Sequence, residues 1–282
     1  MARFTNQAQL RYGNAVANSN IAVGEILEVL AVTKTAVRTT YGQNDRVTYV
    51  INIRNSGTTT LSGLTLSDDL GAYLLEEETR TPLTYVEQTT RYFVNGVLQP
   101  TLAVIEGPPL QISGISVPAG GNAAIVYETA VNTYAPLAQK TAIVNTVTVS
   151  GTGITPVQAQ ETIYADEEPL LTITKSLSPV PVTENGTLTY TFVIQNSGNT
   201  AADADSGVVV TDRFLPILKN ITVSFDGKAW TEPDDYSYDE TTGEFATKTG
   251  QITIPAATYT QDATGAWSVQ PGVGTLVVTG TI

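Results

Sequence analysis

Residues 47–57 read VTYVINIRNSG, and residues 188–198 read LTYTFVIQNSG. In both stretches apolar side chains alternate with polar or smaller ones at a period of two, which is the pattern of a β-strand with one buried face. Both stretches also close on the same Asn-Ser-Gly. Because the same strand and the same turn return in one chain, the sequence indicates two copies of one β-structured module.

The repeat extends in both directions from this strand. Residues 30–35 match 171–176 upstream, and residues 63–68 match 207–212 downstream. The second copy carries extra residues in the loop that contains Asp203 and Asp205, and such insertions belong in exposed loops. The match loosens further on, where Leu276 falls on Ile125 and Val278 falls on Tyr127.

Turn residues and the absence of an amphipathic helical pattern favour a sandwich of antiparallel sheets. Asn95-Gly96 and Asp226-Gly227 stand between apolar stretches, and such pairs favour two-residue hairpin turns because both positions need a positive φ. The predicted fold is all-β, with two tandem Ig-like antiparallel β-sandwich domains and an N-terminal donor hairpin. We place the hairpin at 1–27, the first domain at 28–165 and the second domain at 166–282.

The sequence of a final hairpin stands at the N-terminus and not after the second copy. The first copy continues through residues 143–149 and 159–163, for which the second copy offers no counterpart up to Ile282. Residues 4–10 align with 143–149 and share an asparagine with them, and residues 22–26 align with 159–163. We therefore expect a second domain that lacks its final hairpin and a spare copy of that hairpin at the N-terminus.

An incomplete sandwich exposes unpaired backbone groups and invites pairing with another chain. Donation of a strand satisfies such an edge, and a head-to-tail contact of this kind builds open filaments. We predict a structural subunit that polymerises head-to-tail into an extracellular or spore-surface filament, giving its hairpin to domain 2 of a neighbouring copy. The expected donor residues are Phe4, Asn6, Ala8, Leu10, Tyr12, Val23 and Ile26, and the expected acceptor edge is Leu276, Val278 and Ile282.

Other interpretations of the same pattern remain open. The N-terminal strand could pad domain 1 while domain 2 closes with fewer strands, or the chain could be part of a longer tandem. The main alternative function is a monomeric adhesive or ligand-binding surface module, for which Trp230 and Trp267 are candidate contacts. Aromatic residues in a sandwich are more often core residues.

Composition argues against several classes of function. The chain has no histidine and no cysteine, which removes the commonest general base and the thiol nucleophile. The net charge of -13 disfavours nucleic acid and anionic membranes. No apolar run is long enough for a secretory signal or a membrane span. We expect no enzyme activity, no cofactor, no nucleic acid partner and no membrane insertion, so the remaining partner is the protein itself as a homo-polymer.

Carboxylate-rich stretches offer the remaining candidate sites. Residues 76–78 and 234–235 could act as acid and base, but charge runs of this kind are usually solvated loops. Asp203 and Asp205 could hold calcium, although the full loop pattern is missing, so we expect no metal site.

Lys34 and Lys175 end equivalent strands of the two copies. Each lysine could form an isopeptide cross-link with a nearby asparagine, Asn55 or Asn196. The favoured interpretation is that each lysine reaches solvent or pairs with Asp68 or Asp212.

These residues resemble a known family. An apolar strand ending in Thr-Lys, a tyrosine-centred strand closing in Asn-Ser-Gly and an apolar strand ending in Asp are similar to the bacterial Ig-like surface repeat named domain of unknown function, number eleven. Lys34, Tyr49, Asn55 and Asp68 carry the pattern in the first copy, and Lys175, Tyr190, Asn196 and Asp212 carry it in the second. The resemblance implies an Ig-like fold and a place on Gram-positive cell surfaces or clostridial spore appendages. The permuted hairpin is a departure from the family pattern.

Overall fold

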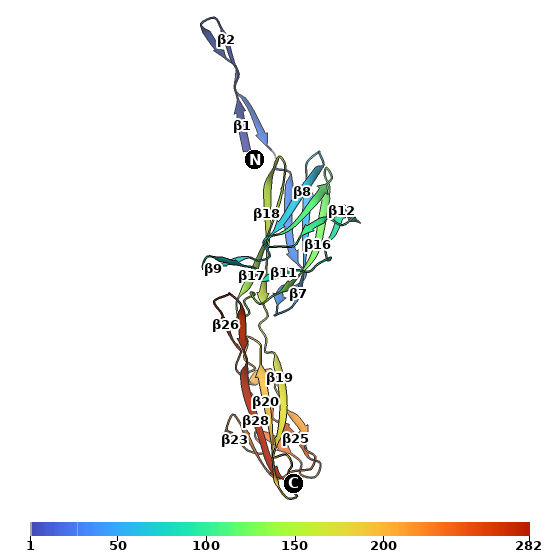
Figure 1. Cartoon of the computed structure of the whole chain (residues 1–282), viewed down its shortest axis with the longest axis vertical. Helices are drawn as coiled ribbons and strands as arrows, with labels where there is room; N and C mark the ends of the chain where they lie inside the picture. Colours follow the sequence, from blue (N-terminus) through green and yellow to red (C-terminus); the bar gives the residue numbers. More distant parts are fainter. Residues whose placement is uncertain (1, 27) are drawn as a thin grey trace. The chain divides into compact units, whose positions relative to one another are not determined.

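A computed structural model describes residues 2–26 and 28–282, and nearly all their regular structure is β-strand (Figure 1). The one helical element in those residues is a single 3-10 turn, η1 (Ala204–Ser206), which lies in the loop that the second copy enlarges. The chain divides into two compact units. The first comprises Met1–Thr39, Arg46–Ala130 and Val144–Thr162, and the second comprises Thr40–Asp45, Val131–Ile143 and Ile163–Ile282.

The N-terminal segment forms a narrow two-stranded ribbon, drawn in blue in Figure 1. Strand β1 (Ala2–Asn6) pairs antiparallel with β4 (Ala22–Ile26), and β2 (Gln9–Tyr12) pairs antiparallel with β3 (Ala15–Asn18). Two hydrogen bonds join the pairs into one ribbon, because Ala8 and Ser19 exchange contacts of 2.9 Å through backbone and side-chain atoms. Among the described residues, these strands pair only with one another and enter no sandwich sheet.

Two six-stranded sheets build the first sandwich. In one sheet the order is β13-β12-β16-β7-β5, with β11 also on β16, and in the other it is β14-β15-β8-β17-β18-β6. The separate strands β9 (Tyr73–Leu75) and β10 (Glu78–Arg80) form a small hairpin. The first sheet comprises β5 (Leu30–Ala36), β7 (Arg46–Asn55), β11 (Leu83–Tyr85), β12 (Arg91–Val94), β13 (Val97–Leu98) and β16 (Asn122–Val131). The second comprises β6 (Thr40–Tyr41), β8 (Leu61–Asp68), β14 (Ala103–Ile105), β15 (Leu110–Val117), β17 (Ala142–Gly151) and β18 (Ile154–Ala165).

The period-two pattern of residues 47–53 forms the middle of this core, as predicted. Tyr49 pairs with Tyr127 and Ile51 pairs with Ile125 across β7 and β16, and all four side chains are wholly buried. Since successive residues of a strand face opposite sides, the alternation of the sequence sends every second side chain into the sandwich. The predicted turn at Asn95-Gly96 is also present, with φ values of 49° and 80°.

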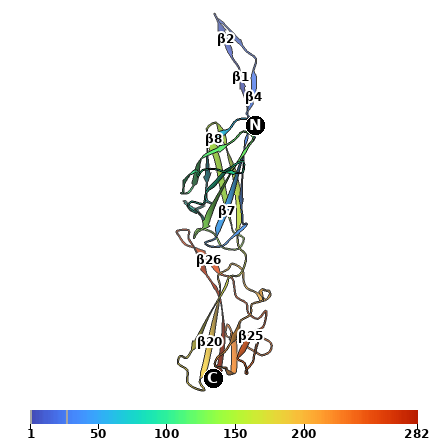
Figure 2. The same ribbon diagram turned by 90° about the vertical axis from the view of Figure 1, so that its right-hand side faces the viewer.

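The second sandwich has fewer strands than the first. A five-stranded sheet has the order β19-β20-β28-β22-β23, a three-stranded sheet has the order β21-β25-β24, and β26 pairs with β27. Strands β20 and β25 belong to different sheets of this sandwich (Figure 2). The strands are β19 (Leu171–Ser178), β20 (Thr187–Asn196), β21 (Thr211–Arg213), β22 (Lys219–Phe225), β23 (Lys228–Trp230), β24 (Tyr236–Tyr238), β25 (Glu244–Thr247), β26 (Thr258–Gln261), β27 (Trp267–Gln270) and β28 (Gly272–Thr281).

The core of the second sandwich lies between its sheets. Tyr190 stacks on Phe214 with ring centroids 4.8 Å apart, and Phe245 packs against Phe214 from the three-stranded sheet. The second predicted turn is present at Asp226-Gly227, with φ values of 48° and 79°. The chain therefore folds as two tandem Ig-like β-sandwich domains preceded by a hairpin.

Candidate functional site: the donor hairpin and an exposed face of the second domain

The hairpin of β17 and β18 closes the first sandwich. Strand β17 pairs antiparallel with β8, so that Val147 lies opposite Asp68 and Val149 lies opposite Leu66. Every second residue of β17 is buried, including Asn145, Val147 and Val149. This hairpin therefore supplies a full strand of core side chains to the sheet that contains β8.

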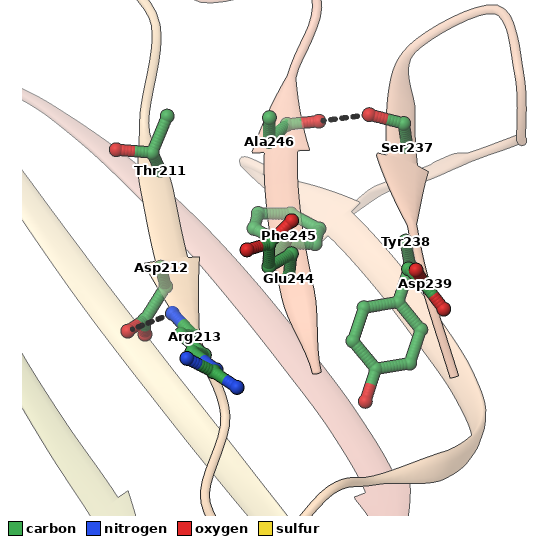
Figure 3. A pocket seen from close by; sticks show the side chains of 9 residues that line it. All are labelled: Thr211, Asp212, Arg213, Ser237, Tyr238, Asp239, Glu244, Phe245 and Ala246. Carbon is green, nitrogen blue, oxygen red and sulfur yellow. Dashed lines mark hydrogen bonds between the residues drawn. The ribbon is translucent and has the colours of Figure 1, made fainter. Parts of the chain in front are cut away.

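Strand β21 is the counterpart of β8 in the second sandwich, but it stands at the edge of its sheet. Figure 3 shows Thr211, Asp212 and Arg213 on β21, with β25 and then β24 on one side of it. In the register, Asp212 pairs with Phe245. Within residues 163–282 the other edge of β21, where β17 lies against β8, carries no paired strand. An edge of this kind presents free backbone donors and acceptors to an incoming strand.

The neighbouring strand β19 shows the same difference in its side chains. Leu30 on β5 is 7% exposed, whereas its counterpart Leu171 on β19 is 37% exposed. Ile173 and Leu177 follow Leu171 on the same face of β19 and are 52% and 46% exposed. Because residues two apart in a strand face the same side, β19 presents an uncovered apolar face.

The first sandwich buries an ion pair at the end of β5. Lys34 Nζ lies 2.5 Å from Asp68 Oδ2, and neither side chain has any exposed surface. The Tyr127 hydroxyl donates to the same carboxylate, and the Leu70 amide donates to its other oxygen at 2.8 Å. Burial lowers the pKa of Lys34 from its ordinary value of 10.5, and the charge of Asp68 offsets part of that effect.

The equivalent pair in the second sandwich is open to solvent. Lys175 contacts Asp212, but the two side chains are 39% and 17% exposed. Lys175 Nζ also lies 4.3 Å from the centroid of the Tyr190 ring, just as Lys34 lies over Tyr49. The predicted pairing of each lysine with its aspartate is therefore confirmed.

The asparagines considered as cross-linking partners have other roles. The Asn55 amide donates to the carbonyls of Thr59, Val117 and Pro118, and its carbonyl accepts from the Gly57 amide. Asn196 holds its own loop in the same way. Both side chains are therefore committed to the Asn-Ser-Gly turns and do not point to the lysines.

A third buried asparagine, Asn145, was not predicted as a partner of the lysines. Its side chain is wholly buried, and neither amide atom has a hydrogen-bond partner in the described part of the chain. It lies two residues before Val147 on the same face of β17, next to the Asp68 position. Burial raises the pKa of Tyr49, and the Asn145 amide offsets part of that rise because it lies near the Tyr49 hydroxyl, although the two groups do not reach hydrogen-bonding geometry. Asn145 thus shares the interior with Lys34, Asp68 and Tyr49.

The structure places the predicted donor residues on an exposed ribbon. Phe4, Leu10 and Tyr12 are 54%, 63% and 62% exposed, and Asn6 and Ala8 are exposed between them. Phe4 packs its ring over the backbone of Gly24, where a Cβ atom would come within 2.3 Å of it.

The other two predicted donor residues are Val23 and Ile26. Val23 pairs with Thr5, whereas Phe4 and Asn6 are the neighbours of Thr5 along β1. Since neighbours along a strand face opposite sides, Val23 lies on the face away from Phe4 and Asn6. The side chain of Ile26 is outside the described part of the chain.

The predicted acceptor edge is wrong. Leu276 and Val278 lie on β28, which pairs with β20 on one side and β22 on the other, and both side chains are wholly buried. Ile282 follows β28, packs against the core and donates its amide to Gly186. A strand in the place of β17 would pair in the other sheet, because β17 pairs with β8 and not with β16. The open edge is therefore β21.

Asp203 and Trp230 have structural roles. Asp203 caps η1 by accepting from the amides of Asp205 and Ser206 at 3.1 Å. No group of three or more acidic side chains in the described residues is arranged to hold a metal ion. Trp230 is 8% exposed and stacks on Phe225, as a core residue does.

A hollow of about 680 Å³ lies over β21, β25 and β24. Figure 3 shows that polar and charged side chains make up most of its lining, among them Asp212, Arg213 and Glu244. No helix in residues 2–26 and 28–282 is long and apolar enough to cross a membrane.

Comparisons with known proteins identify distant similarities only. No protein-family model matches the chain, and no curated protein matches it. Among solved structures, the major pilin subunit BcpA of Bacillus cereus (D312A variant) is 10% identical with a TM-score of 0.37, covering 96% of this chain and 73% of that one. The pilus backbone RrgB of Streptococcus pneumoniae is 13% identical with a TM-score of 0.35, covering 86% and 55%. The collagen-binding domain of a Staphylococcus aureus adhesin is 14% identical with a TM-score of 0.30, covering 49% and 99%. These TM-scores are too low to assign a function.

Proposed function

We propose that this protein is a structural subunit that polymerises head-to-tail, each copy donating its N-terminal hairpin to the second domain of a neighbour. One observation carries the proposal. The Lys34–Asp68 pair is buried in the first domain, which has strands β17 and β18, whereas the equivalent Lys175–Asp212 pair in the second domain is partly exposed. At the same time, residues 2–26 form a hairpin that enters no sandwich sheet. The donated hairpin takes the place that β17 and β18 hold in the first domain.

The alignment of the two hairpins specifies the register of this joint. Residues 4–10 match 143–149, so that Ala8 stands for Val147 and Leu10 stands for Val149. By analogy with β17 on β8, Ala8 lies opposite Asp212 and Leu10 lies opposite Val210 in the joint. Main-chain hydrogen bonds along β21 then give affinity, and the alternate side chains give specificity.

Apolar surface on both partners favours the joint. The hairpin brings the exposed side chains of Phe4, Leu10 and Tyr12, and β19 brings those of Leu171 and Ile173. Removing apolar surface from water is the dominant favourable term in association. In a filament, the apolar surfaces of the hairpin and of β19 are covered in every internal copy, whereas a single copy exposes them.

Strand β7 separates the hairpin from the connection to the second domain. The hairpin leads into Leu30, which pairs with Asn55 at the end of β7, whereas Ala165 pairs with Tyr41, shortly before β7 begins. The ten residues of β7 span roughly 34 Å. The hairpin and Ala165 therefore adjoin opposite ends of this strand.

The composition and the net charge of the chain are consistent with a structural role. The proposed partner is a second copy of the protein, with no cofactor, no nucleic acid and no insertion into a membrane. The family resemblance supports an extracellular place for the filament, on a cell surface or on a spore. We propose no enzymatic activity, and the net charge of -13 is consistent with a soluble, acidic surface.

Electron microscopy and sedimentation of the purified protein test this proposal. We expect filaments from the full chain and none after deletion of residues 1–27. The shortened chain keeps its acceptor face, so adding it to the full chain should shorten the filaments in proportion to its amount. Filaments that form equally well without the hairpin would contradict the proposal, and so would a monomer whose hairpin closes its own second domain. Unchanged binding of a partner by the shortened monomer would favour an adhesive module instead.

A further inference from the structure

We propose that each joint becomes covalent, through an amide bond between Lys175 of one copy and Asn6 of the next, and that Lys34 and Asn145 form the same bond within each chain. The inference rests on the proposed function, because only the donated hairpin brings Asn6 to the second domain. The first domain contains all three residues that such a bond needs, a lysine, an aspartate and an asparagine. The second domain contains the equivalent lysine and aspartate.

The template is the buried cluster of Lys34, Asp68 and Asn145. A wholly buried amide with no hydrogen-bond partner among the described residues calls for an explanation, because native proteins pair such groups. Asn145 precedes by two residues Val147, which pairs with Asp68, and its amide acts on Tyr49, whose ring lies under Lys34. A bond from Lys34 to Asn145 removes the buried charge of the amine and the unpaired Nδ2 group of the asparagine, since the new amide is neutral and Nδ2 leaves.

The second domain repeats the lysine and the aspartate but not the asparagine. Lys175 and Asp212 stand where Lys34 and Asp68 stand, and the strand that carries Asn145 has no counterpart in residues 163–282. The aligned residue of the hairpin is Asn6. In the proposed register Ala8 lies opposite Asp212, as Val147 lies opposite Asp68, and Asn6 precedes Ala8 by two residues on the same face, as Asn145 precedes Val147. The donated strand therefore completes the cluster.

The chemistry of the bond needs no outside reactant. The neutral Nζ of lysine attacks the Cγ carbon of asparagine, forming a C–N bond while the bond from Cγ to Nδ2 breaks. Nδ2 leaves as ammonia with a proton taken from the lysine amine, and the aspartate carboxylate relays that proton. No electrons are gained or lost.

The surroundings favour this step. Burial disfavours the charged form of an amine and so provides the neutral nucleophile, as the lowered pKa of Lys34 illustrates. Lys175 is still 39% exposed, and the donated hairpin covers that face. The reaction between copies therefore depends on assembly, because only the donated hairpin brings an asparagine to Lys175 and excludes water from it.

Mass spectrometry of wild-type filaments of the full chain tests the inference. We expect hot detergent to leave covalent ladders, and protease digests to contain one peptide in which Lys175 is joined to Asn6, lighter than the sum of its parts by one ammonia. The unassembled chain should weigh one ammonia less than its sequence, with Lys34 joined to Asn145. The variants Lys175→Arg and Asn6→Ala should lose the ladder but keep the internal bond, and Lys34→Arg should show the reverse.

The possible outcomes separate the two proposals. Filaments that dissolve completely into chains of full sequence mass would overturn the covalent bonds and leave the polymerisation intact. A ladder that persists in Lys175→Arg and Asn6→Ala filaments would overturn the assignment of these residues. Absence of filaments from the full chain would overturn both the polymerisation and the bond between copies.

Discussion

Replacing Leu10 by aspartate should block assembly without unfolding either domain. Leu10 is 63% exposed in the hairpin, whereas Val149, which it replaces in the joint, is wholly buried in the first domain. Burial of one such side chain stabilises by about 1.5–3 kcal/mol. Its loss raises the critical concentration for assembly by roughly 10- to 150-fold. The introduced carboxylate adds a desolvation cost in the same direction.

Val16→Asp is the matched control. Val16 pairs with Arg11 and Leu10 pairs with Ala17, so Val16 and Leu10 lie on opposite faces of the hairpin. Val16 is 53% exposed and has a similar size and a similar place in the ribbon. Because its face stays in solvent in the joint, we expect its substitution to change the critical concentration by less than roughly threefold.

The assay is pelleting of filaments over a range of protein concentrations, with circular dichroism melting of the unassembled chains. Both variants should melt like the wild type, because the hairpin strands belong to no sandwich sheet. Equal assembly of Leu10→Asp and Val16→Asp would refute the proposed register. Loss of assembly in both would show that the two faces of the hairpin are buried alike.

Three further predictions concern the domains themselves. Asp68→Ala should lower the free energy of unfolding of the first domain by at least about 3 kcal/mol, because it leaves the buried Lys34 without its partner. Asp212→Ala should lower that of the unassembled second domain by about 1 kcal/mol or less, because its ion pair is partly exposed. Similar losses for the two variants in urea denaturation would contradict this. Asn55→Ala should cost about 1–3 kcal/mol, because three carbonyls lose their donor, and the exposed Ser56→Ala serves as control in the same assay. Burial raises the pKa of Tyr41 from 10.0 to about 12, so between these values the unfolded state has lost the proton that the folded state keeps. Stability should therefore fall as the pH rises above 10, and Tyr41→Phe should reduce the slope of the denaturation midpoint against pH.

The strands and their buried faces were predictable from local sequence. The alternation at 47–53 and 188–194 determines which side chains point inward, since the period of a strand is two whatever it pairs with. The turns at Asn95-Gly96 and Asp226-Gly227 were equally readable, because positive φ at both positions is a local requirement. The repeat of Lys34 and Asp68 left two options, a lysine in solvent or an ion pair, and the structure shows the ion pair.

The chain by itself thus determined two β-modules and, in strands such as β7 and β20, which side chains face the core. Only the tertiary structure decided which edge is open, because strand order depends on contacts between residues far apart in sequence. It placed Leu276 and Val278 inside a sheet and β21 at an edge. It also showed that Asn55 belongs to its own turn and that Asn145 is buried near Tyr49, because a period of two specifies the face of a side chain and leaves its neighbours across the sandwich unspecified.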